Sequence, residues 1–246
     1  KKLHLVVVQV GQNTVSAKYI SEKEKAATFI GIGFTHIELR SSLSQKGLVN
    51  EIRRLAQNKK YTGIVIQLPL PKKFDVKEIL DCIPQEKDVD LLSSAGFGAF
   101  AIGKSSILPP TIAAIATLLK GQALKGKKVV VVGAGRLVGI PASIWLLQEG
   151  ALVSVVDRST KDKTALLKQA DIIISGVGKK NVVKGSQIKR GVVVIDAGTS
   201  VEGGQTTGDI EFTSVVAKAK AVTPVPGGVG PLTVAHLLQN TVILGS

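Results

Sequence analysis

The chain has 246 residues, of which 44% are hydrophobic and 20% are charged, and this balance indicates a soluble globular protein and excludes a disordered one. The formal net charge is +14, but the lysines and arginines are spread along the chain in pairs and aromatic residues make up only 4%, which argues against a nucleic-acid partner. An anionic small molecule suits the charge equally well. With so few aromatics the core is built from Val, Ile, Leu and Ala, which favours parallel strands covered by helices.

Cysteine usage and apolar runs bear on the compartment. Cys82 is the only cysteine, so an internal disulfide is impossible and we expect a reducing compartment, the cytoplasm. No run approaches the ~20 apolar residues that a membrane span needs, and no signal peptide is visible, so we expect no membrane partner. The chain contains no methionine and opens on KKLHLVVV, which indicates that the natural start lies further upstream.

Strands and helices alternate along the first half. The patterns predict, in chain order, a strand over 3–10, a helix over 17–32, a strand over 36–40, a helix over 48–57 and a strand over 62–71 that stops at proline. The motif KDVD and a small-residue loop follow. Pro109 and Pro110 then begin a helix that we place over 111–120. The alternation predicts an α/β fold.

The second half begins with a clearer pattern, KKVVVVGAGRLVGIPASIWLLQEGALVSVVDRS. It predicts a strand over 129–132, a glycine turn, a helix that ends at Gly150, and a strand over 153–156. A helix near 163–169 and strands over 171–178 and 191–198 follow. This order is typical of a doubly wound, Rossmann-type dinucleotide-binding unit.

The glycine turn is the candidate phosphate site. Gly133, Gly135 and Gly139 are spaced one residue wider than the commonest dinucleotide fingerprint. The turn lets a pyrophosphate lie against the first N–H groups of the helix, at its positive end. Asp157 closes the next strand, where it would accept hydrogen bonds from an adenosine ribose. The alternative is that Asp157 is a loop carboxylate or a helix cap before Thr160.

The first half carries a polar group of its own. Ser16, Tyr19 and Lys23 are spaced i, i+3, i+7 and therefore share one face of a helix. A Tyr–Lys pair can transfer protons if burial or a neighbouring charge lowers the lysine pKa, although such pairs are far more often ordinary surface. Gln67 ends a very apolar strand, where an amide is costly unless something bonds to it. Asp90 closes KDVD and is equally consistent with a turn carboxylate.

The segment TPVPGGVGPLT near the C-terminus combines two prolines with three glycines. The prolines fix φ and the glycines permit backbone shapes closed to other residues, so the segment is a stiff loop without side-chain bulk. Its residues alone leave two interpretations open. It is either a linker between domains or a wall that lets a flat ligand approach the backbone.

Taken together, these motifs closely resemble the bifunctional methylenetetrahydrofolate dehydrogenase/cyclohydrolases. The resemblance is collinear over nearly the whole chain and rests on VGQNTVSAKYISEK, GIVIQLPLP, EKDVD, the glycine turn with VGIP, VVIDAG, GDIEF, and PVPGGVGPLT with its following LLQNT. It implies two domains with folate in a cleft between them. Residues 1–118 plus 232–246 would form the catalytic domain and residues 119–231 the Rossmann domain.

The resemblance also implies an activity and a set of site residues. The activity is oxidation of 5,10-methylene-tetrahydrofolate with a nicotinamide cofactor, followed by hydrolysis of the methenyl form to 10-formyl-tetrahydrofolate, in one-carbon metabolism and purine biosynthesis. It implies a homodimer through the nucleotide domain and no metal. The implied catalytic residues are Lys23, Tyr19, Gln67 and Asp90. The implied folate-binding residues are Tyr19, Ser16, Gln67, Leu68, Asp90, Pro226, Gly227 and Gly228. The implied cofactor-binding residues are Gly133, Ala134, Gly135, Arg136, Val138, Gly139, Asp157, Arg158, Gly176, Val177, Gly178 and Thr199.

Several positions depart from the family pattern. Leu91 stands where the family motif KDVDG has glycine, and the loop after it also departs from the family pattern. Ala134-Gly135 replaces Arg-Ser in the glycine turn, and Asp157-Arg158 replaces His-Ser after the second strand. Asp157 would repel the 2′-phosphate of NADP, which favours NAD. Arg158 and Arg136, in contrast, could bind that phosphate through their guanidinium groups. Family habit tips our expectation to NADP, with NAD a close alternative.

Two rival functions remain at this point. One is another two-domain dehydrogenase, of shikimate or amino-acid type, which would not explain QLPLP together with PVPGGVGP. The other is a folate- or nucleotide-binding homologue that has lost catalysis.

Overall fold

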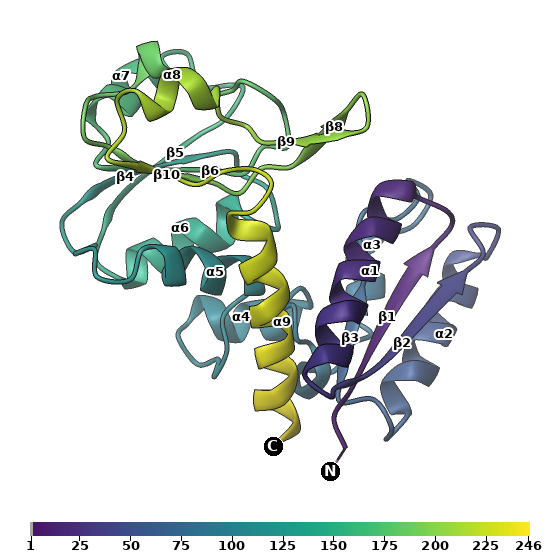
Figure 1. Cartoon of the computed structure of the whole chain (residues 1–246). Coiled ribbons are helices and arrows are strands. Elements are labelled where there is room, and N and C mark those ends of the chain that lie inside the picture. The colour runs from purple at the N-terminus through teal and green to yellow at the C-terminus, as the bar shows by residue number, and fades with distance from the viewer. Residues whose placement is uncertain (1) are drawn as a thin grey trace. The chain divides into compact units, whose positions relative to one another are not determined.

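The computed structural model describes residues 2–246, apart from the side chains of Thr14, Val15 and Glu202. It divides into two compact units, each an α/β arrangement (Figure 1). Unit 1 runs to Pro110 and resumes over Val234–Ser246, and unit 2 is Thr111–Thr233. The two-unit α/β fold predicted from the sequence is confirmed. The first boundary falls earlier than the expected one after residue 118, because the helix that starts at Pro110 groups with unit 2.

Unit 1 is built on a parallel sheet. Within the described residues its strands are β1 (His4–Val10), β2 (Gly33–Leu39) and β3 (Gly63–Ile66), in the order β2-β1-β3. The strands β1 and β3 read as continuous apolar runs because both of their faces are buried.

Helices cover both faces of this sheet. α1 and α9 pack on the face that carries Leu5 and Val7, while α2 and α3 pack on the face that carries Val6 and Val8. Odd-numbered residues of β1 and β3 therefore face α1. The helices of unit 1 are α1 (Thr14–Phe29), α2 (Gln45–Gln57), α3 (Val76–Leu80), the short 3-10 helix Gln85–Lys87, α4 (Ser94–Ala101) and α9 (Val229–Gly245), which enters unit 1 at Val234.

Three sequence predictions need correction in unit 1. The strand predicted over 62–71 ends at Ile66, because the prolines that follow lack N–H donors for a sheet. The loop predicted after KDVD is wrong. It contains α4, whose N-terminus is capped by the Ser93 hydroxyl accepting from Gly96 N at 3.0 Å. Helix α1 begins at Thr14 instead of residue 17, because the Asn13 side chain caps it.

Unit 2 is a doubly wound domain. Among its described residues the parallel sheet has the order β10-β7-β6-β4-β5, so the chain reverses direction across the sheet after β5. The strands are β4 (Lys128–Val132), β5 (Leu152–Val156), β6 (Ile172–Ser175), β7 (Val193–Asp196) and β10 (Ala221–Val222). Its helices are α5 (Pro110–Leu118), α6 (Gly139–Gln148), α7 (Lys163–Gln169), the 3-10 helix Gly185–Gln187 and α8 (Phe212–Val216).

A small antiparallel hairpin follows β7 in unit 2 (Figure 1). Its strands are β8 (Ser200–Glu202) and β9 (Gln205–Thr207). The sequence analysis predicts neither the hairpin nor α8 and β10. These elements are only two to five residues long, too short for a periodic pattern to stand out. The predicted strands of the doubly wound core are present, although β6 and β7 are shorter than predicted.

Candidate active site

Helix α1 presents Ser16, Tyr19 and Lys23 on one face, as their spacing predicts. Asn13 fixes the start of the helix by accepting a hydrogen bond from Ser16 N at 3.0 Å. Ser16 is buried, and Tyr19 and Lys23 are half-buried. The helix packs on the sheet face to which Gln67 belongs. The Lys23 ammonium is therefore held at the edge of the core.

Gln67 is the direct partner of Lys23. It follows β3, and its Oε1 accepts a hydrogen bond from Lys23 Nζ at 2.9 Å. Its Nε2 donates to the carbonyl oxygen of Leu68 at 2.8 Å. The two contacts fix the orientation of the amide, because one end must accept and the other must donate. The amide at the end of an apolar strand thus has the partners that the sequence analysis requires of it.

Asp90 lies in a loop that is anchored on both sides. Asp88, which is buried, accepts hydrogen bonds from Leu92 N and Ser93 N at 3.2 and 2.8 Å. Asn240 of α9 donates to the carbonyl oxygen of Val89 at 2.9 Å. Between these anchors the backbone passes through Leu91, whose φ is +53° and whose side chain is buried. The family glycine that Leu91 replaces suits this conformation, so the leucine is strained here.

The charges of Lys23 and Asp90 act on each other. Burial lowers the pKa of Lys23, and the Asp90 charge partly opposes this effect. Burial raises the pKa of Asp90 to about 6, against the effect of Lys23, while Asp88 raises it further. Both groups are thereby moved toward neutral pH, where a group can both take and return a proton.

Gln9 is a further polar residue that the sequence analysis missed. It lies on β1 one position beyond the paired residues Val8 and Ile66, beside Gln67 and on the same face. It is only 5% exposed. Its Nε2 donates to Gly11 O at 3.0 Å, and its Oε1 is the one buried side-chain oxygen or nitrogen without a partner among the described residues. An amide within the apolar run LHLVVVQV is the same signal that singles out Gln67.

In unit 2 the implied cofactor residues gather at one edge of the sheet. They follow the carboxyl ends of adjacent strands β5, β4, β6 and β7. In doubly wound folds this edge is where nucleotides bind. The residues are Gly133, Ala134, Gly135, Arg136, Val138 and Gly139 after β4, Asp157 and Arg158 after β5, Gly176, Val177 and Gly178 after β6, and Thr199 after β7.

The backbone around the glycine turn is closely packed, as a pyrophosphate-binding turn requires. Gly133 has a φ of +99°, and a Cβ there would meet the Gly176 oxygen at 3.1 Å. A Cβ on Gly139 would overlap the Gly133 oxygen, and one on Gly176 would overlap Val138. The turn opens directly into α6, whose first N–H groups offer donors to an anion. These residues fit the group that the family implies.

Asp157 is engaged in its own turn. Its Oδ1 accepts hydrogen bonds from Ser159 N and Ser159 Oγ at 2.8 and 2.6 Å, and these bonds lower its pKa. Thr160 Oγ1 accepts from the Asp157 N–H at 3.1 Å. The carboxylate therefore makes hydrogen bonds within its own turn, and it keeps an exposed negative charge beside Arg158.

The PVPGG loop lies in unit 2 and is stiff. Val225–Pro226 is cis, and Gly227 has a φ of +101°. A Cβ on Gly228 would meet the Pro224 oxygen at 2.5 Å, so this position admits no side chain. Pro226 and Gly227 are exposed. The geometry matches a rigid backbone surface without side-chain bulk.

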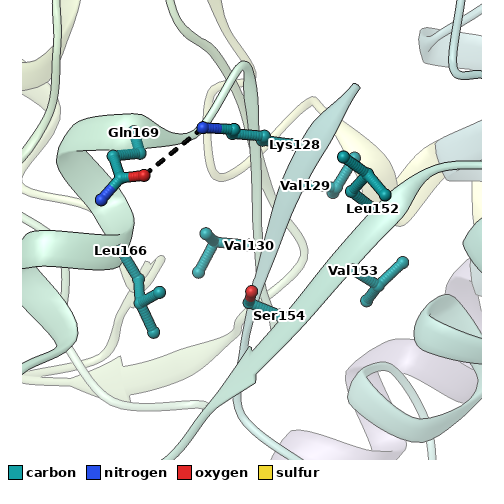
Figure 2. A pocket seen from close by; sticks show the side chains of 8 residues that line it. All are labelled: Lys128, Val129, Val130, Leu152, Val153, Ser154, Leu166 and Gln169. Atoms are coloured by element: carbon teal, nitrogen blue, oxygen red, sulfur yellow. Dashed lines mark hydrogen bonds between the residues drawn. The ribbon is translucent and has the colours of Figure 1, made fainter. Parts of the chain in front are cut away.

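A cavity of about 300 Å³ lies elsewhere in unit 2 (Figure 2). It is lined at the amino ends of β4 and β5, where Lys128 Nζ donates to Gln169 Oε1 at 3.4 Å, and its other lining is mainly apolar. The cofactor residues follow the opposite ends of these strands. The cavity is therefore not the nucleotide site.

A Rossmann-type unit and an α/β unit with a desolvated lysine define a class, the two-domain dinucleotide-dependent dehydrogenases. The particular family follows from the sequence. Residues 1–90 match the catalytic domain of tetrahydrofolate dehydrogenase/cyclohydrolase, and residues 109–245 match its NAD(P)-binding domain. The chain belongs to the tetrahydrofolate dehydrogenase/cyclohydrolase family. It is accordingly an oxidoreductase and a hydrolase of one-carbon metabolism, and a tetrahydrofolate derivative is its substrate.

Relatives match over almost the whole chain. The bifunctional protein FolD of Agathobacter rectalis is 42% identical over 241 residues, 97% of this chain and 86% of that protein. The FolD structure from Campylobacter jejuni has a TM-score of 0.95 at 38% identity and covers 99% of this chain and 88% of that one. The Trypanosoma brucei enzyme, solved with NADP and an inhibitor, has a TM-score of 0.94 at 36% identity and covers 99% and 86%.

The rival dehydrogenase class shares only the fold. A shikimate 5-dehydrogenase from Thermus thermophilus has a TM-score of 0.58 at 13% identity and covers 99% of this chain and 93% of that one. The alternative functions kept open by the sequence are thus not favoured. Along residues 2–246, no helix has the length and apolar character needed to cross a membrane.

Proposed function

We propose that Lys23 is the proton-transfer group of the hydrolysis reaction in this chain, with Gln67, Asp90 and Tyr19 around it. The observation that carries the proposal is the desolvated Lys23 ammonium, bonded to Gln67 and lowered in pKa. Its position near an ionisable carboxylate supports a group that can exist in both protonation states.

The dehydrogenase step requires orientation more than acid–base chemistry. When bound, the nicotinamide cofactor accepts the hydride that leaves the bridging methylene carbon of the folate. The methylene carbon becomes a methenyl cation, so no proton is exchanged. In this proposal Ser16, Tyr19 and Leu68 line the folate site and Asp90 accepts hydrogen bonds from N–H groups of the pterin. These contacts hold the carbon in place.

The hydrolysis step requires proton transfer. Water adds to the methenyl carbon and loses one proton to the neutral Lys23 amine. The carbon–nitrogen bond then breaks, the departing ring nitrogen takes a proton from the Lys23 ammonium, and the hydroxyl loses its proton as the formyl group forms. One proton is released overall. Gln67 Oε1 keeps the Nζ atom in place throughout, and Tyr19 lies one helical turn away.

The second unit supplies the cofactor and a surface for the pterin. We propose NADP as the cofactor, with NAD as the runner-up. The exposed guanidinium groups of Arg136 and Arg158 support NADP, as does the NADP complex of the Trypanosoma brucei relative, whereas the exposed charge of Asp157 favours NAD. The stiff backbone of the PVPGG loop supports the proposal that Pro226, Gly227 and Gly228 form a wall beside the flat pterin ring.

We also propose a homodimer that acts in the cytoplasm. β5 is an edge strand of the unit 2 sheet, and Leu152 and Val155 on it and Leu147 on the neighbouring α6 are exposed. An exposed strand edge can pair with another chain, and an exposed apolar patch marks an interaction site. The free thiol of Cys82 supports a reducing compartment.

The activity and its residues are tested together in one assay series. The parent is assayed for methylene-tetrahydrofolate oxidation with NADP and with NAD, and for hydrolysis of methenyl-tetrahydrofolate alone. Lys23→Met should abolish hydrolysis while NADP still binds, because the amine is lost and the fold is kept. Hydrolysis at the parent rate would refute the role of Lys23. Arg158→Ala should lose NADP-dependent activity selectively, and a strong preference of the parent for NAD would refute the cofactor choice.

A further inference from the structure

Unit 2 contains two buried aspartates, Asp196 and Asp209, that take no part in the sites above. Asp196 is 3% exposed and Asp209 is 0% exposed. A carboxylate is almost never buried in this way unless it is well satisfied. Most of their partners are backbone N–H groups of loops at the carboxyl edge of the sheet.

Asp209 ties down the loop that follows β6. Its Oδ2 accepts hydrogen bonds from Ser175 Oγ and Val177 N, both at 2.7 Å, and its Oδ1 accepts from Lys179 N at 2.9 Å. The carboxylate therefore spans the loop from its first residue to its last. Between Ser175 and Lys179 lie Gly176, Val177 and Gly178, three of the proposed cofactor residues.

Asp196, at the end of β7, holds Asp209 in turn. Its Oδ1 accepts hydrogen bonds from Gly198 N and Asp209 N, each at 3.1 Å, and its Oδ2 accepts from Ile210 N at 3.0 Å. Its own N–H donates to Thr223 Oγ1 at 2.7 Å. The backbone of Asp209 is thus fixed before its side chain reaches the β6 loop. We call Asp196 and Asp209 together the carboxylate clasp.

The clasp explains glycines in the motifs DAG and GDI. A Cβ on Gly198 would overlap the Asp209 carboxylate, and a Cβ on Gly208 would overlap Asp196 Oδ2. Both glycines are therefore required by the carboxylates that pass close to them. The backbone there has no room for a different arrangement.

The loop held by the clasp also abuts the phosphate turn. The Gly176 oxygen is 3.1 Å from where a Cβ of Gly133 would lie, and a Cβ on Gly176 would overlap Val138. A shift of the β6 loop by less than an ångström would therefore disturb the turn between β4 and α6. The positions of the β6 loop and of this turn are therefore coupled, and the clasp fixes the position of the β6 loop.

We propose that Asp209, fixed by Asp196, is a positioning residue for dinucleotide binding, which sets the Gly176–Gly178 backbone against the Gly133 turn. The inference rests on the proposed cofactor site. It assigns Asp209 no contact with the cofactor or the folate. It predicts that loss of the carboxylate weakens dinucleotide binding while the chemistry at Lys23 continues.

The test compares Asp209→Asn with the parent in three measurements. Asparagine has nearly the same shape, but its NH₂ group cannot accept a bond from the loop. The dissociation constant for NADP, measured by calorimetry, should rise at least about tenfold, the effect of losing one hydrogen bond to a charged group. Methenyl-tetrahydrofolate hydrolysis, assayed without nicotinamide cofactor, should stay within about twofold of the parent, because Lys23 and Gln67 belong to unit 1 and Asp209 contacts neither. A larger loss is what removing a bond at the reacting group itself would cause. Hydrogen exchange in peptides that cover Ser175–Lys179 should become faster.

Two further variants separate positioning from general stability. Ser175→Ala removes one of the donors to Asp209 and should shift NADP affinity in the same direction by a smaller factor. It carries the test if Asp209→Asn does not fold. Val215→Ala, in the core of the same unit, lowers stability without touching the clasp and should leave NADP affinity unchanged.

Several outcomes would overturn the proposal. The first is an NADP affinity of Asp209→Asn equal to that of the parent or, where Ser175→Ala carries the test, an unchanged affinity of that variant. The second is an unchanged rate of hydrogen exchange in the β6 loop. The third is an equal loss of NADP affinity in Val215→Ala. If the parent itself binds neither NADP nor NAD, the proposed cofactor site fails. The exchange measurement then still shows whether the clasp orders the loop.

Discussion

Asp90 is ionised at neutral pH at a cost to the fold. Burial raises its pKa to about 6 even though Lys23 opposes the shift. In an unfolded chain the same group has a pKa of about 3.9. The folded state therefore holds this proton more tightly than the unfolded state does. Asp90 contributes most to stability below about pH 4, and its contribution is lost as pH rises through about 6.

We predict that Asp90→Asn stabilises the protein at high pH. At pH 8 the free energy of unfolding of the variant should be about 1–3 kcal/mol higher than that of the parent, and at pH 4 the two should differ little. Only the charged form of the parent carries the burial penalty. Urea unfolding of the parent and the variant between pH 4 and pH 8 measures this difference. Folate affinity should fall in the variant, since asparagine replaces an ionised acceptor.

The matching control is Asp81→Asn in the same unit. Asp81 is exposed, and accepts from Ser94 N and Ser94 Oγ at the start of α4. Its removal should lower stability modestly and should produce no gain at pH 8. If Asp90→Asn were less stable than the parent at pH 8, Asp90 would be a structural ion-pair partner instead of a strained functional group.

Gln9 yields a second prediction at the scale of single residues. Its buried Oε1 has no partner among the described residues, and an unsatisfied buried acceptor costs about 1–3 kcal/mol. Gln9→Leu should therefore raise stability by about 1 kcal/mol, after allowance for the lost bond to Gly11. Thermal or urea unfolding measures the change. A loss of stability would indicate that Oε1 has a buried partner, such as water.

Single residues show how far sequence reasoning reaches at this site. The contact between Lys23 and Gln67 could be anticipated, because a helix-face lysine and a strand-end amide are both costly to bury alone. Gln9 carries the same signal but stands inside an apolar run that predicts one continuous strand. The positive φ of Leu91 had no sequence signal except its departure from the family glycine, because leucine does not favour that conformation.

At the scale of elements, α9 connects the catalytic loop to the core of unit 1. Asn240 is buried, and its Nδ2 donates to the carbonyl oxygens of Val89 and Leu108, each at 2.9 Å. One side chain thus ties down both ends of the segment that contains Asp90 and α4. The motif LLQNT, which marks this helix in the sequence, contains this asparagine.

We predict that Asn240→Ala destabilises the protein by about 2–4 kcal/mol, because the carbonyl groups of buried Val89 and half-buried Leu108 lose their donor. The KM for the folate substrate should also rise, since the Asp90 loop loses an anchor. Unfolding and steady-state kinetics measure the two effects. Gln239→Ala, on the exposed side of α9, is the matched control, and a similar loss there would contradict the role given to Asn240.

Element prediction succeeded where a pattern was long. The continuous Val/Ile runs of β1, β4, β6 and β7 are signals of buried parallel strands, and the glycine turn marks the start of α6. α4 was missed because its sequence SAGFGAFA looks like a loop by composition. Its formation depends on the Ser93 cap and on burial of Phe100, which are not periodic features.

At the scale of the whole molecule, the β5 edge of the unit 2 sheet carries exposed apolar side chains. β5 is one of the two edge strands, and Leu152 on it is 59% exposed, while Leu147 on the adjoining α6 is 61% exposed. The cavity of Figure 2 lies beside the same strand and is lined partly by Leu152 and Val153. An exposed strand edge with apolar side chains can associate with another strand edge or apolar surface.

We predict that this edge is the homodimer interface. In analytical ultracentrifugation the parent should sediment as a dimer at micromolar concentration, and Leu152→Lys should shift it to a monomer, because the new ammonium group would be buried unpaired in the contact. Phe29→Lys, an equally polar change at a residue 90% exposed in unit 1, should leave the dimer intact. A Leu152→Lys protein that remains a dimer, or a Phe29→Lys protein that dissociates, would place the interface elsewhere. Because Lys23 and its partners belong to unit 1, the hydrolysis rate of a monomeric Leu152→Lys variant should stay near that of the parent.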